Sequence, residues 1–255
     1  MARRSKPPIW RTIRAGYASA AEQFRALGSA TVIAVVLVAI LQLIRVPTQE
    51  SVSAIVRPVL VSLASAIVLS PYAVLVHRRI LLGIDDRSYW TTFSAPRTLA
   101  FTSAAIGLGL LSEVGLMALL VGIRPPEPRV VLSLLGMAWI IVALGVFCRA
   151  ALVFPIIAVD GSTTPWRDSL RLTQGNAWRI FWIVMVSVLP LLLALLVVSN
   201  GIYWLFGTPD DSWLAWAMAR LGSAIFSTFQ YALLVSILSC LYQTRTTWAN
   251  ADGQG

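Results

Sequence analysis

The sequence predicts an all-α polytopic integral membrane protein with six transmembrane helices, and two observations support this fold class. Its 255 residues are 58% hydrophobic and only 12% charged, with a mean hydropathy of +0.78, whereas soluble domains contain about 25% charged residues. The apolar residues also gather in long runs. A helix of about 20 such residues crosses the roughly 30 Å of bilayer hydrocarbon with all its backbone hydrogen bonds satisfied.

Six apolar runs have the necessary length. They predict spans at about 27–46, 54–76, 98–123, 130–159, 177–199 and 213–241. The runs lack the alternation and the turns of an outer-membrane barrel, so strands are not expected. The chain therefore divides into a basic amphipathic segment (1–28), a six-helix transmembrane domain (29–242) and a cytoplasmic tail (243–255).

The distribution of lysine and arginine predicts the orientation. Fourteen of these 20 residues precede the first span or lie in the second loop, the fourth loop or the tail, and four lie in the first and third loops. By the positive-inside rule, both termini are expected in the cytoplasm of a bacterium, with the spans in its inner membrane. The net charge of +9 then reflects topology and attraction to anionic lipids, and no nucleic-acid partner is expected.

The segment before the first span predicts an amphipathic helix lying on the membrane. Its apolar residues recur every three or four positions: Ile9, Ile13, Tyr17, Ala20, Phe24 and Leu27. Its charged residues fall on another face: Arg11, Arg14, Glu22 and Arg25.

The fourth loop interrupts the apolar sequence with a short polar helix. Thr164 is suited to cap it, Pro165 to be its first residue, and Asp168 to lie in its first turn, near the positive helix end. Gly175 can adopt the left-handed conformation that ends this helix, and Asn176 can cap the next one. We expect an interfacial elbow that leads into the fifth span.

This elbow supplies candidate lipid-binding residues. Trp166, Leu170 and Thr173 are predicted to share one face of the short helix. Arg167 and Arg171 share another, and two like charges four residues apart repel each other unless an anion lies between them. A lipid phosphate is such an anion. The lipid-headgroup candidates are Arg167, Arg171, Trp178 and Arg179.

The loops also resemble a known family. The run from Arg149, RAALVFPIIAVDG, followed by WRDSLRLTQGNAWRIF, and the run HRRILLG from His77 before PRTLAF, resemble an uncharacterised family of six-helix bacterial inner-membrane proteins. That family is related to the membrane domains attached to some glycerophosphodiester phosphodiesterases. Gln174 stands where the family is expected to have a basic residue. The resemblance implies a fold and an inner-membrane location, and it implies no activity.

Ionisable side chains within spans are rare, because each costs from about 2.5 kcal/mol upward at the bilayer centre. Glu113 lies sixteen residues beyond Arg97, and Arg149 lies eleven residues before Asp160. These offsets place the two side chains about 24 and 16 Å from the cytoplasmic ends of their helices. We predict a Glu113–Arg149 ion pair that fixes helix register. A proton or ion pathway, or no contact at all, are the alternatives.

The sequence contains few residues suited to catalysis. Cys148 and Cys240 are far apart in apolar runs, and His77 is expected as a polar residue at the membrane interface. No metal-ligand, nucleophile or phosphate-loop motif is visible, so we expect no cofactor and no enzyme. The expected function is that of a scaffold, assembly or lipid-organising factor, whose partners are anionic lipids and either a membrane protein or a second copy. The alternative is a small transporter or channel that uses Glu113 in a kinked helix bundle.

Overall fold

The computed structural model describes residues 9–43, 53–84, 88–123, 129–207 and 212–252, and every regular element within these ranges is a helix. Five helices are long and apolar enough to cross a membrane, and six if the bent pair α1–α2 forms one span. The chain is therefore an all-α polytopic membrane protein. The helices are α1 (Ile9–Ala26), α2 (Gly28–Leu43), α3 (Ser53–Leu82), α4 (Tyr89–Phe93), α5 (Pro96–Gly122), α6 (Val130–Ala150), α7 (Val153–Ala158), α8 (Pro165–Thr173), α9 (Ala177–Phe206) and α10 (Trp213–Asp252).

The fourth predicted span differs most from the structure. It was expected to run to residue 159, but α6 ends at Ala150 and the short helix α7 follows as a separate element. Pro155 explains the break, since proline has no amide hydrogen to donate to the carbonyl four residues earlier, at Ala151, and its ring clashes with that carbonyl. The first predicted span matches α2, and its residues 44–46 lie outside the described residues. The helix α10 continues past the predicted start of the tail, to Asp252.

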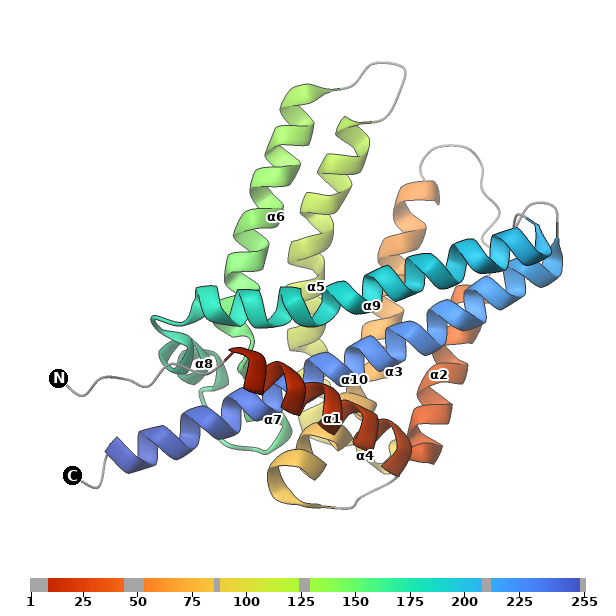
Figure 1. The fold of residues 1–255 in the computed structure, drawn as a ribbon. Helices are drawn as coiled ribbons and strands as arrows, with labels where there is room; N and C mark the ends of the chain where they lie inside the picture. The colour runs from red at the N-terminus through yellow and green to blue at the C-terminus, as the bar shows by residue number, and fades with distance from the viewer. Residues whose placement is uncertain (1–8, 44–52, 85–87, 124–128, 208–211, 253–255) are drawn as a thin grey trace.

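Helix α1 is amphipathic as predicted, but its apolar face packs on protein. It meets α2 at an angle of 92°, and it lies alongside α10 (Figure 1). Gly16 permits the close approach, because a Cβ atom there would lie 2.4 Å from Cγ1 of Ile237. The Tyr17 hydroxyl donates a hydrogen bond of 2.6 Å to the Ser187 carbonyl of α9. The helix is thus a fixed part of the bundle, and only its opposite face is free to meet the membrane.

The helical hairpins α5–α6 and α9–α10 extend in different directions. Figure 1 shows α9 and α10 crossing the group formed by α2, α3, α5 and α6, while the α5–α6 hairpin projects to one side. Helices α5 and α6 approach each other closely, since a Cβ at Gly136 would lie 2.4 Å from the Leu119 nitrogen and one at Gly122 would lie 2.5 Å from the Ser133 nitrogen. These glycines fix the register between the two helices.

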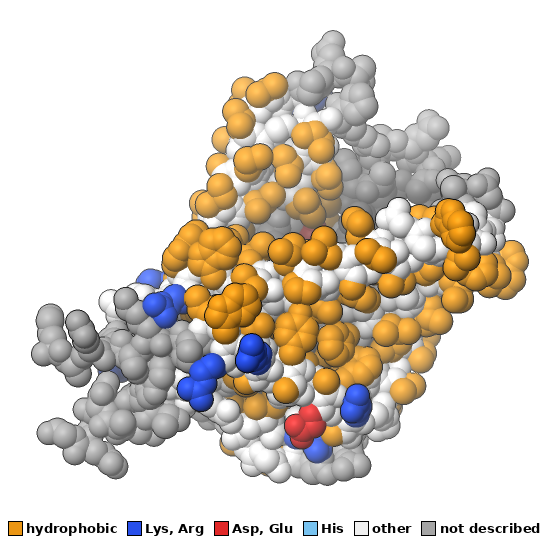
Figure 2. All heavy atoms as spheres, viewed as in Figure 1, with side chains coloured by type: hydrophobic (Ala, Val, Ile, Leu, Met, Phe, Trp, Pro, Cys, Tyr) orange, Lys and Arg blue, Asp and Glu red, His pale blue; other side chains and the backbone are white. Residues whose placement is uncertain are grey.

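The surface of the hairpins is apolar. Only 17%, 11% and 17% of the most apolar windows of α5, α6 and α9 are buried within the chain. Figure 2 shows apolar side chains covering α6 and α9, while arginine side chains gather over α1 and beside α8. Exposed apolar surface of this extent is typical of helices that face lipid.

His77, which the sequence predicts at the membrane interface, is buried within the protein beside Arg78 of α3. Its side chain is fully buried between α3 and α10, with the Phe101 ring 5.9 Å away. Nδ1 lies 2.7 Å from Oγ of Ser239, and that hydroxyl donates its own hydrogen to the Val235 carbonyl. Both contacts are satisfied together when His77 Nδ1 carries the proton and the Ser239 oxygen accepts it, and we assign this tautomer. Nε2 is buried without a hydrogen-bond partner.

Candidate functional site

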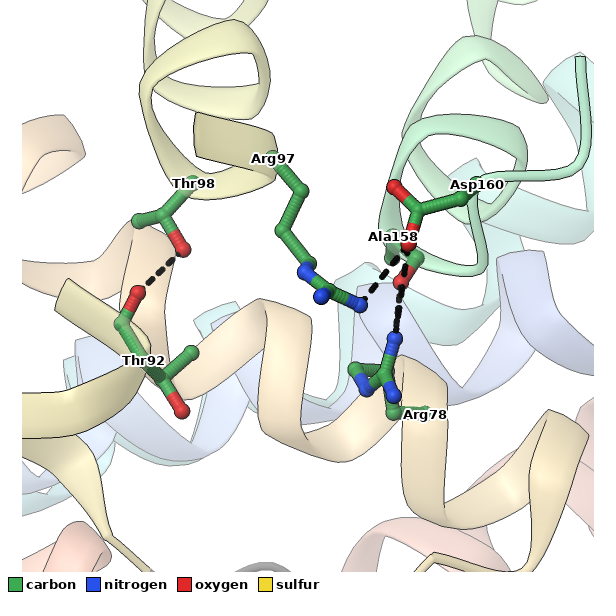
Figure 3. A network of polar contacts seen from close by, with 6 residues as sticks. All are labelled: Arg78, Thr92, Arg97, Thr98, Ala158 and Asp160. Atoms are coloured by element: carbon green, nitrogen blue, oxygen red, sulfur yellow. Dashed lines mark hydrogen bonds and ion pairs between the residues drawn. The ribbon is translucent and has the colours of Figure 1, made fainter. Parts of the chain in front are cut away.

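The candidate site lies at one end of the bundle, which we call the basic face. There the C-terminal ends of α3 and α6 meet the N-terminal ends of α5 and α9, together with the short helices α4, α7 and α8. Three charged side chains from separate segments converge on this face (Figure 3). We call Arg78, Arg97 and Asp160 the Arg–Asp cluster.

One carboxylate oxygen forms ion pairs with both arginines of the Arg–Asp cluster. Arg97 Nη1 lies 2.8 Å from Asp160 Oδ2, and Arg78 Nη1 lies 3.8 Å from the same atom. Arg78 also donates a long hydrogen bond of 3.4 Å to the Ala158 carbonyl. Two guanidinium groups thus face a single carboxylate, and the cluster keeps one excess positive charge.

The start of α5 positions Arg97. Pro96 is the first residue of this helix, and the N-cap residue Ala95 has extended backbone and no side chain able to cap it. The Thr98 hydroxyl donates a hydrogen bond of 2.6 Å to the Thr92 carbonyl, which holds α4 against the first turn of α5 (Figure 3). Arg97 therefore projects from a fixed helix end.

Tyr89 fixes the other end of this unit, and its replacement gives a testable prediction. Its ring is buried, and its hydroxyl donates a hydrogen bond of 2.5 Å to the Val68 carbonyl of α3. We expect Tyr89→Phe to lower the free energy of unfolding by about 1 kcal/mol, the usual value of one such bond. Thermal unfolding in detergent measures this difference.

Tyr89→Phe also changes how the free energy of unfolding depends on pH. Burial raises the pKa of Tyr89 from 10.0 to about 12. The stability linked to this phenol is present in full below pH 10 and is lost as pH rises through about 12, because the folded state holds the proton more tightly. The difference in unfolding free energy between wild type and Tyr89→Phe should therefore become smaller between pH 10 and 12. A gap that stays constant over this interval contradicts the assignment.

The turn after α7 positions Asp160. Its φ of +52° is uncommon for a residue other than glycine, although aspartate tolerates it better than most. The Gly161 amide donates a hydrogen bond of 2.9 Å to the Ile156 carbonyl and so closes the turn. The Asp160 carboxylate then points toward Arg97 (Figure 3).

A cleft of about 460 Å³ opens beside the cluster. This volume is within the range of roughly 300–1,000 Å³ seen for small-molecule sites. The first residues of α5 and α8 border the cleft, and the positive end of the α5 helix dipole lies at its wall. Its lining residues are Pro96, Arg97, Ala100, Ile157, Asp160, Gly161, Ser162, Thr163 and Pro165.

The polar helix α8 begins as predicted, but its cap differs. Pro165 is its first residue and Asp168 lies in its first turn. Thr164 occupies the N-cap position, yet its side chain makes no capping hydrogen bond. The Ser162 hydroxyl instead orders the turn before α8, because it accepts a hydrogen bond of 2.9 Å from the Thr164 amide and donates one to Asp168.

The turn between α8 and α9 follows the prediction in part. Gly175 has the expected left-handed conformation, with φ of +75°. Asn176 is the N-cap residue of α9, but the prediction that its side chain caps this helix is wrong. Its Nδ2 donates a hydrogen bond of 3.2 Å to the Gln174 carbonyl, so the side chain closes the preceding turn.

Thr173 departs from the predicted apolar face of α8. Thr173 is buried, together with Ser169, whereas Trp166 and Leu170 are each 45% exposed. Both buried hydroxyls donate hydrogen bonds of 3.0 Å to the Arg149 carbonyl. The reason is that α6 ends at the next residue, and carbonyls in the last turn of a helix lack intrahelical donors.

The lipid-headgroup candidates lie together on α8 and the first turn of α9. Arg167 and Arg171 are exposed, and within the described ranges neither forms an ion pair. Trp178 is 66% exposed and stacks on Phe181, with ring centroids 4.9 Å apart. Arg179 is half-buried. No hydrogen bond joins these candidates to the Arg–Asp cluster in the described part of the chain.

The predicted Glu113–Arg149 ion pair does not form. Arg149 lies in the last turn of α6 and is exposed, while Glu113 Oε2 is buried without a hydrogen-bond partner. A Cβ at Gly115 would lie 3.1 Å from the Ile140 nitrogen, so Glu113 lies level with about residue 142 of α6. Arg149 is seven residues further on, about 10 Å along the axis.

Sequence reasoning missed the Arg–Asp cluster. In the sequence, Arg78 and Arg97 indicate only orientation, and Arg97 and Asp160 serve otherwise only as helix ends from which the depths of Glu113 and Arg149 follow. The available signal was their position at helix ends, since Arg97 follows a helix-starting proline and Asp160 precedes a glycine.

Comparisons with protein-family models, curated proteins and solved structures find no match for this chain.

Proposed function

We propose that this protein is a multi-pass protein of the bacterial inner membrane, with both termini in the cytoplasm, that binds anionic lipid headgroups at its basic face and along the exposed side of α1. In this proposal it acts without catalysis, as a scaffold, assembly or lipid-organising factor. The family resemblance in its loops supports the same location. Its partners are anionic membrane lipids and a membrane protein or a second copy of the chain.

The observation behind the proposal is an excess of exposed arginine beside exposed tryptophan. Five arginines on two helices are exposed and form no ion pair within the described residues: Arg11, Arg14, Arg25, Arg167 and Arg171. Exposed tryptophans stand on α1, α4 and α8 and at the start of α9: Trp10, Trp90, Trp166 and Trp178. Indole rings prefer the headgroup level, and each arginine near an anionic leaflet contributes about 1 kcal/mol.

Native mass spectrometry of the gently solubilised protein tests the proposal. We expect the wild type to retain cardiolipin or phosphatidylglycerol in preference to phosphatidylcholine. Arg167→Gln and Arg171→Gln should each lower this preference about fivefold, since about 1 kcal/mol is lost per charge. The double variant should lose more than tenfold.

Arg129→Gln is the matched control. Arg129 is exposed, but it precedes α6 at the opposite end of the α5–α6 hairpin from the basic face. The same loss of one charge there should leave the lipid preference unchanged. An equal effect of all three substitutions, or no preference for anionic lipid in the wild type, contradicts headgroup binding at the basic face.

The second candidate is a small transporter or channel, and one observation favours it. Glu113 has a buried carboxylate oxygen without a partner inside a span. The hydroxyls of the same helix favour the scaffold instead, because Ser112 and Ser103 donate to carbonyls of α5, Leu108 and Leu99, and are satisfied there. Reconstituted flux that disappears with Glu113→Gln would favour the transporter.

A further inference from the structure

The Arg–Asp cluster has many more donors than acceptors. Each guanidinium group has five N–H donors. Arg97 makes one short contact, to Asp160, and Arg78 makes only long contacts of 3.4 and 3.8 Å. The side chains of Arg78 and Arg97 are 20% and 30% exposed, so both are accessible from solvent. An additional anion at this point would satisfy donors that the protein leaves unused.

The cleft beside Arg97 suits an anion in its other walls as well. The first residues of α5 and α8 line it, and neither helix has a side-chain cap on its first amides. The N-terminal end of α5 therefore borders this space, and such ends favour phosphate groups. The α8 residue at the cleft is Pro165, which has no amide hydrogen, and Asp168 lies in the first turn of that helix. The hydroxyl-bearing residue Thr163 also lines the cleft of about 460 Å³, whereas the Ser162 hydroxyl donates its hydrogen to Asp168.

We infer that this cleft is a phosphate site, which binds one phosphate group through Arg97 and the N-terminal end of α5. Arginine binds phosphate oxygens with two parallel hydrogen bonds, which fits the unused donors of Arg97. Asp160 is then an internal competitor that holds Arg97 while the cleft is empty. The inference rests on the proposed function, since it names a specific headgroup site, but it concerns different residues from the α8 arginines.

Two substitutions with opposite expected results test this site. Arg97→Gln should weaken phosphate binding about tenfold or more, because it removes charged hydrogen bonds. Asp160→Asn should strengthen binding about fivefold, because it removes a like charge beside the anion and frees Arg97. Asparagine tolerates the left-handed backbone at this position, so the variant keeps the turn. If the cluster serves only to clamp the helices together, Asp160→Asn lowers stability without any gain in affinity.

Three soluble probes distinguish the source of the phosphate. The full chain in detergent is titrated with inorganic phosphate, with dihexanoyl phosphatidylglycerol and with dihexanoylglycerol, which lacks the phosphate. Binding is followed by native mass spectrometry and thermal shift. Saturable binding of the phospholipid that inorganic phosphate does not displace identifies a lipid headgroup, and equal binding of inorganic phosphate identifies a free anion. Both results support a phosphate site.

Arg14→Gln is the control, since it removes an exposed arginine of α1 that does not line the cleft. It should leave the affinity of the soluble probes unchanged. Equal binding of dihexanoylglycerol, or an affinity unaffected by Arg97→Gln and Asp160→Asn, overturns the inference. Neither result affects the α8 experiment, so a failure of the phosphate site and a failure of the proposed function are distinguishable.

Discussion

Gly136→Ala is expected to lower the free energy of unfolding by about 1–3 kcal/mol, the usual cost of overpacking. A Cβ at this position of α6 would lie 2.4 Å from the Leu119 nitrogen and 2.8 Å from the Gly115 oxygen. Both are backbone atoms of α5, so no side-chain rotation relieves the clash. The two helices must separate, and the close contact along the hairpin is lost. Thermal unfolding in detergent measures the effect.

Gly145 provides the control on the same helix. A Cβ there meets no atom within 4 Å. Alanine in an open helical position usually stabilises by about 0.5–1 kcal/mol relative to glycine, because the unfolded chain loses less entropy on folding. The two substitutions should therefore shift the unfolding temperature in opposite directions. Shifts of the same sign would show that α5 and α6 do not pack through Gly136.

Ser239→Ala is expected to lower the free energy of unfolding by a similar amount, about 1–3 kcal/mol. The serine hydroxyl is the acceptor for His77 Nδ1, at 2.7 Å in the core. Without the Ser239 hydroxyl, the buried N–H group of His77 has no hydrogen-bond partner, and its full desolvation cost destabilises the folded state. Ser227→Ala on α10 is the control, because Ser227 donates only within its own helix, to the Ser223 and Ala224 carbonyls. Its removal should have little effect on thermal unfolding.

A double-mutant cycle separates the hydrogen bond from other effects. His77→Leu removes the histidine together with its unpartnered Nε2. Replacing both members of a buried polar pair with apolar groups costs less than leaving one of them unpaired. The double variant of His77 and Ser239 should therefore lose less stability than the sum of the single variants. Strict additivity would argue against the bond.

The elements that the sequence predicted correctly depend on local properties. The apolar runs gave the positions of α5 and α9 because crossing a bilayer requires length and hydropathy alone. Pro165 and Gly175 marked the ends of α8 for a similar reason. Proline has the backbone angle of a first helical residue, and glycine readily adopts the left-handed conformation that ends a helix. The break after Ala150 was available in the same way from Pro155, but the apolar run continues beyond it and concealed the end of the helix.

The contacts that the sequence did not predict join segments distant in the chain. The hydrogen bond between His77 and Ser239 joins residues that are 162 positions apart in the sequence. The ion pair of Arg97 with Asp160 depends on how α5 and α7 are placed in space. Glu113 and Arg149 were compared by their distance from helix ends, whereas their separation follows from the register that the glycines of α5 and α6 impose. Such registers are properties of packed surfaces and do not follow from hydropathy.

The length of α10 has a mechanical consequence. Its apolar part, Trp213–Thr246, has 34 residues, which is about 50 Å of helix against roughly 30 Å of hydrocarbon. A helix that exceeds its bilayer inclines to fit, and its packing against neighbouring helices sets the angle. Because α1 packs on α10 at Gly16 and through the Phe24–Phe229 ring contact, the inclination of α10 is also carried to α1.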